Sequence, residues 1–335
     1  MDFKRILRTI VLGPFNILMG MGDVPANTMT AHDLTGKRED LSDEISIITP
    51  IDSPFYHAIG TAECTAVKHE FMTDVIRQPG ANKAKFGSDP TIGTSQQPVK
   101  LHNFVQLQEE SFSIDDTSNA VKTAGNSGSY EYQKALKMKA LVGDMEYAFL
   151  REVRAEGSAA VAPSMRGLLN WQTTNLDKAD DAVLEADGTI TGGTARELER
   201  EMVKGVLQDI FTSGGGGQGK VLTAYCGAIQ KTKFDKFFNR DFDRRDVGKN
   251  EAKDTVDLYI TSFGTVKAEI HRTMPADVFS IADLAFWKKA TLIPIGTAEL
   301  AKTSRSNAKH HMTVQHTLEA KNEATSGRLT NLAIV

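Results

Sequence analysis

The sequence contains few of the residues from which disulfide frameworks, zinc clusters and membrane spans are built. Its two cysteines, Cys64 and Cys226, lie far apart in a chain of 335 residues and form no paired spacing. They predict buried apolar residues or free thiols in a reducing compartment, and they argue against a disulfide framework or a zinc cluster. No segment approaches the roughly 20 apolar residues that a transmembrane helix needs, so we expect no membrane partner.

An excess of positive charge is also missing. The chain has 39 Lys and Arg residues against 43 Asp and Glu residues, which gives a net charge of −4. Such a surface provides no basic field for gathering nucleic acid, so we expect no sequence-independent DNA binding by the whole surface. With 40% hydrophobic and 24% charged residues, the composition is typical of a soluble globular protein. The length suits about two domains.

The N-terminus has the charged and apolar regions of a signal peptide without its other features. Three basic residues precede an uncharged run over residues 9–22, but Pro14 interrupts the run and no small-x-small cleavage site follows. We predict an amphipathic arm that lies on another protein surface, with a targeting segment as the alternative. Further along this arm, Ser42, Asp43 and Glu44 predict a short helix over residues 42–48 that stops before Pro50.

Two strand-like segments follow the arm. Residues 63–76 and 99–114 alternate in polarity, and the interval 78–98 between them is too polar to pack a core. We therefore predict a two-stranded β-ribbon with a flexible tip. Because an isolated ribbon is at best marginally stable in water, we expect it to lie against something else, such as another subunit.

A long helix is predicted next. Residues 128–156 contain no proline, and their apolar side chains recur with helical spacing until Gly157 ends the helix. A loop carrying RGLLNW, residues 166–171, leads to a second helix that should begin at Thr194, because Thr194 and Glu197 have the spacing of a capping box.

The remaining chain predicts a mixed α/β block and a closing sheet. Strands are expected at residues 220–226, 256–260, 265–271 and 278–281, with a helix at 228–238 and a short capped turn at 283–290. Residues 312–319 then alternate in polarity, and a turn at Gly327 predicts a terminal hairpin whose sheet packs on the long helix.

The segment GGGGQGK, residues 214–220, has the spacing of a phosphate-binding loop. Such a loop follows a strand, opens a helix and carries a hydroxyl residue for magnesium. This one follows a predicted helix, leads into a strand, and has Val221 where the hydroxyl belongs. We therefore predict a helix-to-strand linker. A nucleotide-binding enzyme using the Gly214–Lys220 loop is the alternative from a different functional class.

Other candidates for chemistry lack the required spacing. On a strand, His310 and His316 share a face but lie about 20 Å apart, and His311 points the other way, so we predict no metal site. The adjacent acidic pairs at 109–110, 115–116 and 180–181 point to opposite faces when on strands and are predicted to be solvated or intersubunit charge. We find no catalytic triad and expect neither enzymatic activity nor a cofactor.

The order of these elements resembles the Hong Kong 97-like fold of tailed-phage major capsid proteins, an α+β fold. Three local segments are similar to one subfamily: GKREDLSDEISIITPIDSPFYHAIG at residues 36–60, RGLLNW at residues 166–171, and the tail from residue 282 to residue 332. The resemblance implies an N-terminal arm at 1–62, an extended loop at 63–114, a spine helix with the first part of a peripheral domain at 115–190, an inserted axial domain at 191–285, and a return to the peripheral domain sheet at 286–335.

The resemblance also implies a function without catalytic residues. It implies a subunit that self-assembles through hexamers and pentamers into an icosahedral shell, enclosing double-stranded DNA without sequence-specific binding. Portal, scaffolding or decoration proteins are the further partners implied, in a virion assembled in the host cytoplasm; an encapsulin-like cellular nanocompartment is the alternative with the same fold. As candidate assembly contacts we name Ile51, Asp52, Pro54, Phe55, Tyr56, Arg77, Lys85, Phe86, Arg244 and Arg245, with packing inside their own subunit as the alternative for Phe55 and Tyr56.

Overall fold

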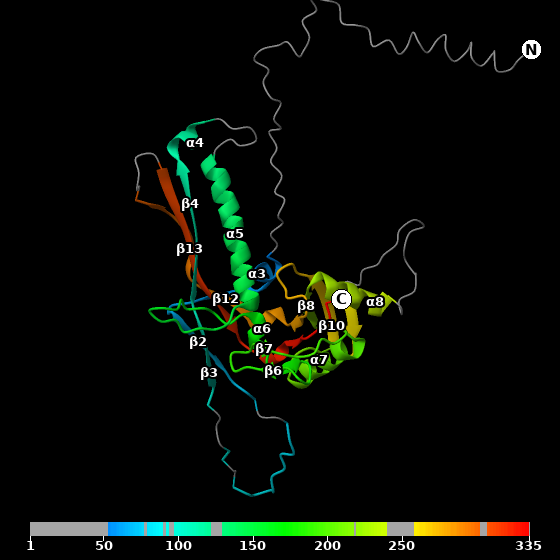
Figure 1. Ribbon diagram of the computed structural model, residues 1–335. Coiled ribbons are helices and arrows are strands. Elements are labelled where there is room, and N and C mark those ends of the chain that lie inside the picture. Colours follow the sequence, from blue (N-terminus) through cyan, green and yellow to red (C-terminus); the bar gives the residue numbers. More distant parts are fainter. Residues whose placement is uncertain are drawn as a thin grey trace, which may run out of the picture. The chain divides into compact units, whose positions relative to one another are not determined.

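The computed structural model describes most of the chain from residue 53 onward (Figure 1). The described residues are 53–76, 79–89, 92–93, 97–121, 129–217, 219–239, 258–301 and 307–334. Residues 1–52 of the predicted arm, with the predicted helix at 42–48, lie outside these residues. No helix of the described ranges is long and apolar enough to cross a membrane.

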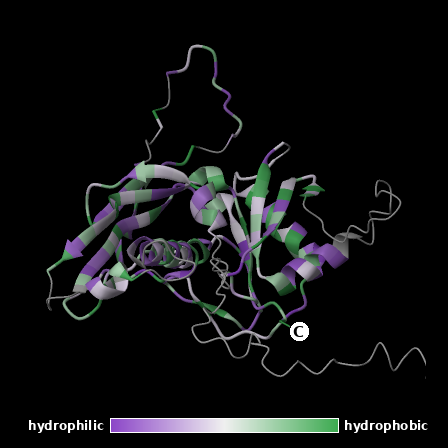
Figure 2. Ribbon diagram, turned by 90° about the horizontal axis from the view of Figure 1, so that it is seen from above, coloured by the Kyte–Doolittle hydropathy of each residue, from purple (hydrophilic) through white to green (hydrophobic). Residues whose placement is uncertain are grey.

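A four-stranded sheet carries the long helix. Its strand order is β1 (Gly60–Glu63), β12 (Trp287–Leu300), β13 (Asn307–Ala320) and β4 (Gln106–Asp115), in which only the β1–β12 pair is parallel. Helix α5 (Ser129–Arg151) runs beside β4 and β13 (Figure 1). Leu141 and Met145 of the helix pack on Met312 and Val314 of β13. The alternation of hydrophobic and hydrophilic residues along these strands is visible in Figure 2 and leaves one face of the sheet apolar toward the helix.

A six-stranded mixed sheet forms the second core. Its order is β5 (Asn175–Asp177), β14 (Gly327–Leu329), β11 (Phe279–Ala282), β8 (Val221–Cys226), β10 (Gly264–Ile270) and β9 (Leu258–Thr261). Helices α7 (Arg200–Thr212) and α8 (Ala228–Asn239) supply apolar side chains to the same core, among them Val206, Ile210 and Phe234. The strands predicted at 220–226, 265–271 and 278–281 and the helix at 228–238 are thereby confirmed. Both cysteines are buried and free, as expected.

Shorter elements connect these cores. They are α3 (Pro54–Ala58), β2 (Lys68–Thr73), β3 (Val99–Phe104), α4 (Asp116–Ala120), α6 (Leu168–Trp171), β6 (Val183–Leu184), β7 (Ile190–Thr191), and the 3₁₀ turns η1 (Leu284–Phe286) and η2 (Glu323–Thr325). The turn η1 is capped as predicted, since the Asp283 side chain accepts a hydrogen bond from the Ala285 N–H. The segment RGLLNW, by contrast, is partly helical rather than a loop, because residues 168–171 form α6.

The predicted ribbon is shorter than its sequence pattern. Only β2 and β3 pair with each other, and the second strand then changes partner, because β4 is hydrogen-bonded to β13. The change occurs at Asn103, Phe104 and Val105, which are all buried although strict alternation would expose one of them. The Asn103 amide donates to the Leu318 carbonyl at 2.8 Å. This buried bond attaches the base of the ribbon to the four-stranded sheet.

Three further boundaries differ from the prediction. Helix α5 ends at Arg151 rather than at 156, because Ala155 forms a β-bridge with Ser164 instead of another helical turn. Helix α7 begins at Arg200 rather than at Thr194, whose N–H and hydroxyl donate to the Asp181 carboxylate. The terminal hairpin is wrong: β14 pairs with β5 and β11 in the six-stranded sheet and not with β13.

His316 on β13 gives the structure a titratable group buried against the long helix. Its ring stacks on Phe149 with centroids 4.8 Å apart, and neither ring nitrogen has a hydrogen-bond partner in the described part of the chain. Burial lowers the pKa of His316 to about 4. The folded protein therefore keeps this imidazole neutral at a pH where the unfolded chain, with an ordinary pKa of about 6.5, is already protonated.

We predict that His316 makes stability fall as the pH is lowered. Between pH 6.5 and about 4 the unfolded chain binds one more proton at this position than the folded chain, so the free energy of unfolding decreases through that window. His316→Phe should keep the stacking on Phe149 and remove this contribution. The free energy of unfolding of the variant should therefore decrease less than that of the wild type as the pH falls. Urea unfolding at a series of pH values measures the difference; parallel pH curves for the two proteins would contradict it.

Candidate functional site: a buried junction between α3, the long helix and both sheets

The most deeply buried carboxylate in the described residues belongs to Glu146 on α5, and it is fully inaccessible to solvent. Its two oxygens accept the first two N–H groups of α3: Phe55 N–H donates to Oε1 at 2.9 Å, and Tyr56 N–H donates to Oε2 at 2.8 Å. N–H groups in the first turn of a helix have no partner within the helix, and a negative charge there is favourable. Glu146 therefore fixes the start of α3 to the long helix.

A third donor reaches Glu146 from the six-stranded sheet. His271, which follows β10, places Nε2 2.6 Å from Glu146 Oε1, and both side chains are fully buried. The Thr273 backbone N–H donates to His271 Nδ1 at 3.2 Å. Because a backbone N–H can only donate, Nδ1 is the acceptor and the proton of a neutral ring is on Nε2. Glu146 is thus an anion that accepts three hydrogen bonds, which is how a buried carboxylate is stabilised.

Lys289 of β12 supplies the positive charge near this carboxylate. Its ammonium donates to the Tyr56 carbonyl at 2.9 Å and lies 3.8 Å from the centre of the Tyr56 ring. Burial lowers the pKa of Lys289, and the charge of Glu146 opposes that shift. Burial also raises the pKa of the Tyr56 hydroxyl. Lys289 thereby ties the four-stranded sheet to α3. We call Phe55, Tyr56, Glu146, His271 and Lys289 the Glu146 junction.

An aromatic wall closes the Glu146 junction on one side. The Tyr225 ring of β8 meets the rings of Phe55 and His271 edge to face, with centroids 5.7 and 5.8 Å apart. Burial raises the pKa of the Tyr225 hydroxyl far above its usual value, so this phenol stays protonated. Aromatic pairs in this arrangement stabilise by about 0.5–1.5 kcal/mol beyond the area they bury. The wall makes the position of Phe55 dependent on the six-stranded sheet.

The candidate contact residues that the structure describes fall into two groups, one at α3 and one in the loop between β2 and β3. Pro54 begins α3, and Phe55 is fully buried in its own subunit, which agrees with the alternative of packing inside that subunit. Tyr56 is half-buried by the same packing, and a subunit contact of either side chain stays a prediction. Lys85 and Phe86 lie in the exposed loop between β2 and β3. Ile51, Asp52, Arg77, Arg244 and Arg245 lie outside the described residues.

The sequence offered one signal for the Glu146 junction that the prediction missed. Glu146 lies four residues after Val142 and three before Phe149, and so falls within the apolar stripe of the long helix. A charged residue on such a stripe is rarely buried without a partner. The partners Phe55 and His271 are 91 and 125 residues away in the chain, and no local pattern identifies them.

The ribbon exposes apolar side chains instead of burying them. Met72 is 72% exposed, Ile76 is 90% exposed, and Phe86 is fully exposed. The loop that holds Phe86 turns at residues 85–88, where the Ser88 N–H donates to the Lys85 carbonyl at 3.2 Å, and Gly87 has a φ of +79°. These exposed apolar side chains thus lie on the ribbon and its loop and belong to none of the buried cores.

The glycine-rich loop packs against the protein rather than forming a phosphate cradle. It follows α7 and leads into β8, as predicted for a linker. A Cβ at Gly215 would lie 2.7 Å from the Thr325 backbone, and the Gly217 N–H donates to the Phe263 carbonyl. Lys220 lies over the Phe286 ring and 3.9 Å from Asp283. Close packing thus explains Gly215 and Gly216, whereas positive φ angles explain Gly214, Gly217 and Gly219.

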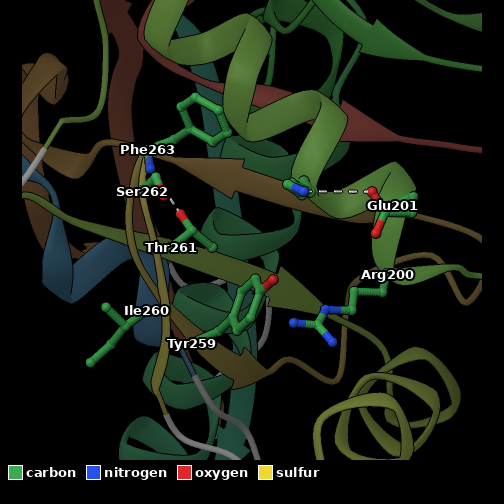
Figure 3. Close-up of a pocket in the computed structure, with 8 residues that line it drawn as sticks. Arg200, Glu201, Tyr259, Ile260, Thr261, Ser262 and Phe263 are labelled. Atoms are coloured by element: carbon green, nitrogen blue, oxygen red, sulfur yellow. Dashed lines mark hydrogen bonds and ion pairs between the residues drawn. The ribbon is translucent and has the colours of Figure 1, made fainter.

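A separate open pocket of about 450 Å³ lies between α7 and β9 (Figure 3). Arg200, Glu201 and Lys204 contribute to its lining, together with residues 259–263. Lys204 is paired with Glu201 at 3.8 Å, and Figure 3 marks an interaction of Glu201 with a dashed line. The pocket mixes charges of both signs at an exposed helix end, and it contains none of the residues of the glycine-rich loop.

Solved structures with a similar fold are phage and phage-like capsids. The capsid protein of cyanophage A-1(L) matches with a TM-score of 0.63 at 12% identity, covering 90% of this chain and 98% of that one. The capsid of a native GTA particle matches with a TM-score of 0.62 at 11% identity over the same shares, and Mycobacterium phage Che8 with a TM-score of 0.55 at 9% identity, covering 89% and 98%. These likenesses establish the Hong Kong 97-like fold.

Sequence comparison identifies the family. The major capsid protein of Escherichia phage Phieco32 is 26% identical over 121 residues, which are 36% of this chain and 34% of that protein. The match thus spans about a third of the curated relative. The family model of the SU10 major capsid protein matches residues 25–333, nearly the whole sequence. The chain belongs to the SU10 major capsid protein family.

Proposed function

We propose that this chain is the self-assembling structural subunit of an icosahedral phage head and not an enzyme. The family match over residues 25–333 carries the proposal. In such a head the subunit forms hexamers and pentamers, is assembled in the host cytoplasm, and encloses double-stranded DNA without reading its sequence. The net charge of −4 suits a container that must not adhere to its contents. Portal, scaffolding or decoration proteins are the expected further partners.

We further propose a domain organisation for the chain. The proposed parts are an N-terminal arm at 1–62, an extended loop at 63–114, a spine helix with the first part of the peripheral domain at 115–190, an axial domain at 191–285, and a return to the peripheral sheet at 286–335. The exposed apolar side chains of the ribbon support an intersubunit role for the extended loop. Many such modest contacts, repeated around a closed shell, give strong assembly without any single strong contact.

Electron microscopy of the purified protein tests the proposed function. We expect megadalton rings or shells when the full-length chain is concentrated over a range of salt and pH. A chain that remains a small monodisperse monomer under all of these conditions would overturn the proposal. Titration calorimetry with ATP and GTP tests the alternative class, and saturable binding that Lys220→Ala removes would favour it.

We predict that deleting residues 78–98 separates folding from assembly. The described residues of this segment are exposed and add no side chain to the buried cores, so the deleted chain should keep its melting temperature to within a few degrees. It should assemble poorly, since Lys85 and Phe86 are lost together with the rest of the tip. Calorimetry and electron microscopy measure the two effects. Particles of normal yield and size would show that the tip is dispensable.

A further inference from the structure

A second cavity has a volume of about 270 Å³. The end of α5, strand β14 and the segments before β7 and β11 contribute to its walls. Its charged lining residues are Arg151, Arg328 and Asp277, and its polar ones include Asn170, Thr189 and Asn331. Two guanidinium groups and one carboxylate leave the lining with a net positive charge.

Arg328 is the unusual member of this lining. It is 4% exposed, yet the only hydrogen bond of its side chain to a described residue joins Nη2 to the Gly188 carbonyl, at 2.6 Å. Its Nε is buried without an acceptor, and no carboxylate of the described residues forms an ion pair with it. Arg196 shows the usual arrangement, because its Nη1 lies 2.7 Å from Asp177 Oδ1 although it is more exposed.

The surroundings of Arg328 increase its need for a negative partner. The charge that acts on Arg328 is that of Arg166, which has the same sign and whose own Nε donates to the Asn170 carbonyl at 2.8 Å. Burial lowers the pKa of Arg328 to about 10, and Arg166 acts in the same direction. The guanidinium is therefore still charged at neutral pH. A charge that is taken out of water without a partner is strongly unfavourable.

We propose that this cavity binds an oxyanion, a carboxylate or a phosphate, with Arg328 as its buried cation. A guanidinium presents two parallel N–H groups to two oxygens of such a group, and Arg328 has N–H groups to spare. Arg151 adds a second positive charge at the cavity wall, while its Nη1 donates to the Thr273 carbonyl at 3.4 Å. The negative charge of Asp277 repels the anion and so lowers the affinity of the cavity for it. The oxyanion can come from solution, as free phosphate, or from an acidic side chain of a second copy of the chain.

Titration of the full-length protein with inorganic phosphate, and separately with acetate, tests this site at constant ionic strength. We expect saturable binding by calorimetry and a rise in melting temperature. Arg328→Met, which keeps much of the apolar stem, should weaken phosphate binding at least tenfold. Asp277→Asn should strengthen it several-fold, and Arg196→Met serves as the matched control with unchanged affinity.

Two results would overturn the site. One is phosphate binding by Arg328→Met with the affinity of the wild type. The other is the absence of saturable phosphate binding in both the wild type and Asp277→Asn. This result would overturn the site even if Arg328→Met does not fold. The same titration on assembled shells separates the two sources: binding that persists in the shell indicates a free anion, and binding that is lost on assembly indicates a carboxylate supplied by a neighbouring copy.

Discussion

Glu146→Ala is expected to lower the free energy of unfolding by about 3–5 kcal/mol, because it removes one partner from a buried set of charged and polar groups. The substitution leaves three buried donors without an acceptor: the N–H groups of Phe55 and Tyr56 and the Nε2–H of His271. Each unsatisfied buried donor costs about 1–3 kcal/mol, and water that enters the vacated space offsets part of the sum. Urea unfolding, followed by circular dichroism, measures the loss.

Glu146→Gln separates the charge from the shape of the side chain. Glutamine keeps the volume and one acceptor oxygen, but its NH₂ group faces a donor where the second carboxylate oxygen was. We expect an intermediate loss of about 1–3 kcal/mol. Glu131→Gln is the matched control, because Glu131 is exposed in the first turn of the same helix and should change stability by less than about 0.5 kcal/mol. An alanine variant at position 146 within that same small range would refute the structural role of the carboxylate.

Local periodicity predicted most elements of the fold, because it reports which face of a segment is buried. The stripe that includes Leu141 and Met145 identified the long helix, and the alternation from Met312 to Leu318 identified β13. Both patterns arise from burial against whatever partner is present. They hold in the structure even though the partners could not be named in advance.

The choice of strand partners could not be predicted in this way. The segment 106–115 reads as a continuation of the ribbon strand, yet it pairs with β13, about 200 residues later in the chain. The segment 327–329 has the pattern of a hairpin return, yet it lies between β5 and β11. Alternation is satisfied equally by either partner. The difference lies in long-range contacts such as that between Asn103 and Leu318.

The Glu146 junction could not be predicted for the same reason. Its five residues come from α3, α5, β12 and the end of β10, and each is ordinary in its own segment. What makes them a unit is the burial of one carboxylate whose donors come from two other elements. A loss of packing in either sheet therefore reaches α3 through Glu146. In a shell subunit, this connects α3 to both cores.

Phe55→Ala is expected to release α3 from the Glu146 junction. Truncating a fully buried phenylalanine costs about 3–5 kcal/mol, and Phe55 is the only fully buried side chain of this helix. A helix of five residues is not stable on its own in water, so α3 depends on this anchor and on its two bonds to Glu146. We expect faster proteolytic cleavage near residues 53–59, and a lower melting temperature as well, because Tyr225 of β8 loses the ring it packs on.

His57→Ala provides the comparison for this release, because His57 lies in the same helix and is exposed. It should be cleaved at the wild-type rate. If the shell function is right, Phe55→Ala should also assemble less well, since α3 would lose its fixed attachment to the long helix. Wild-type cleavage of Phe55→Ala would mean that the N–H bonds to Glu146 and the Lys289 contact hold α3 without the ring. The same experiment on a double variant with Glu146→Gln would then show release, because the remaining anchor is weakened as well.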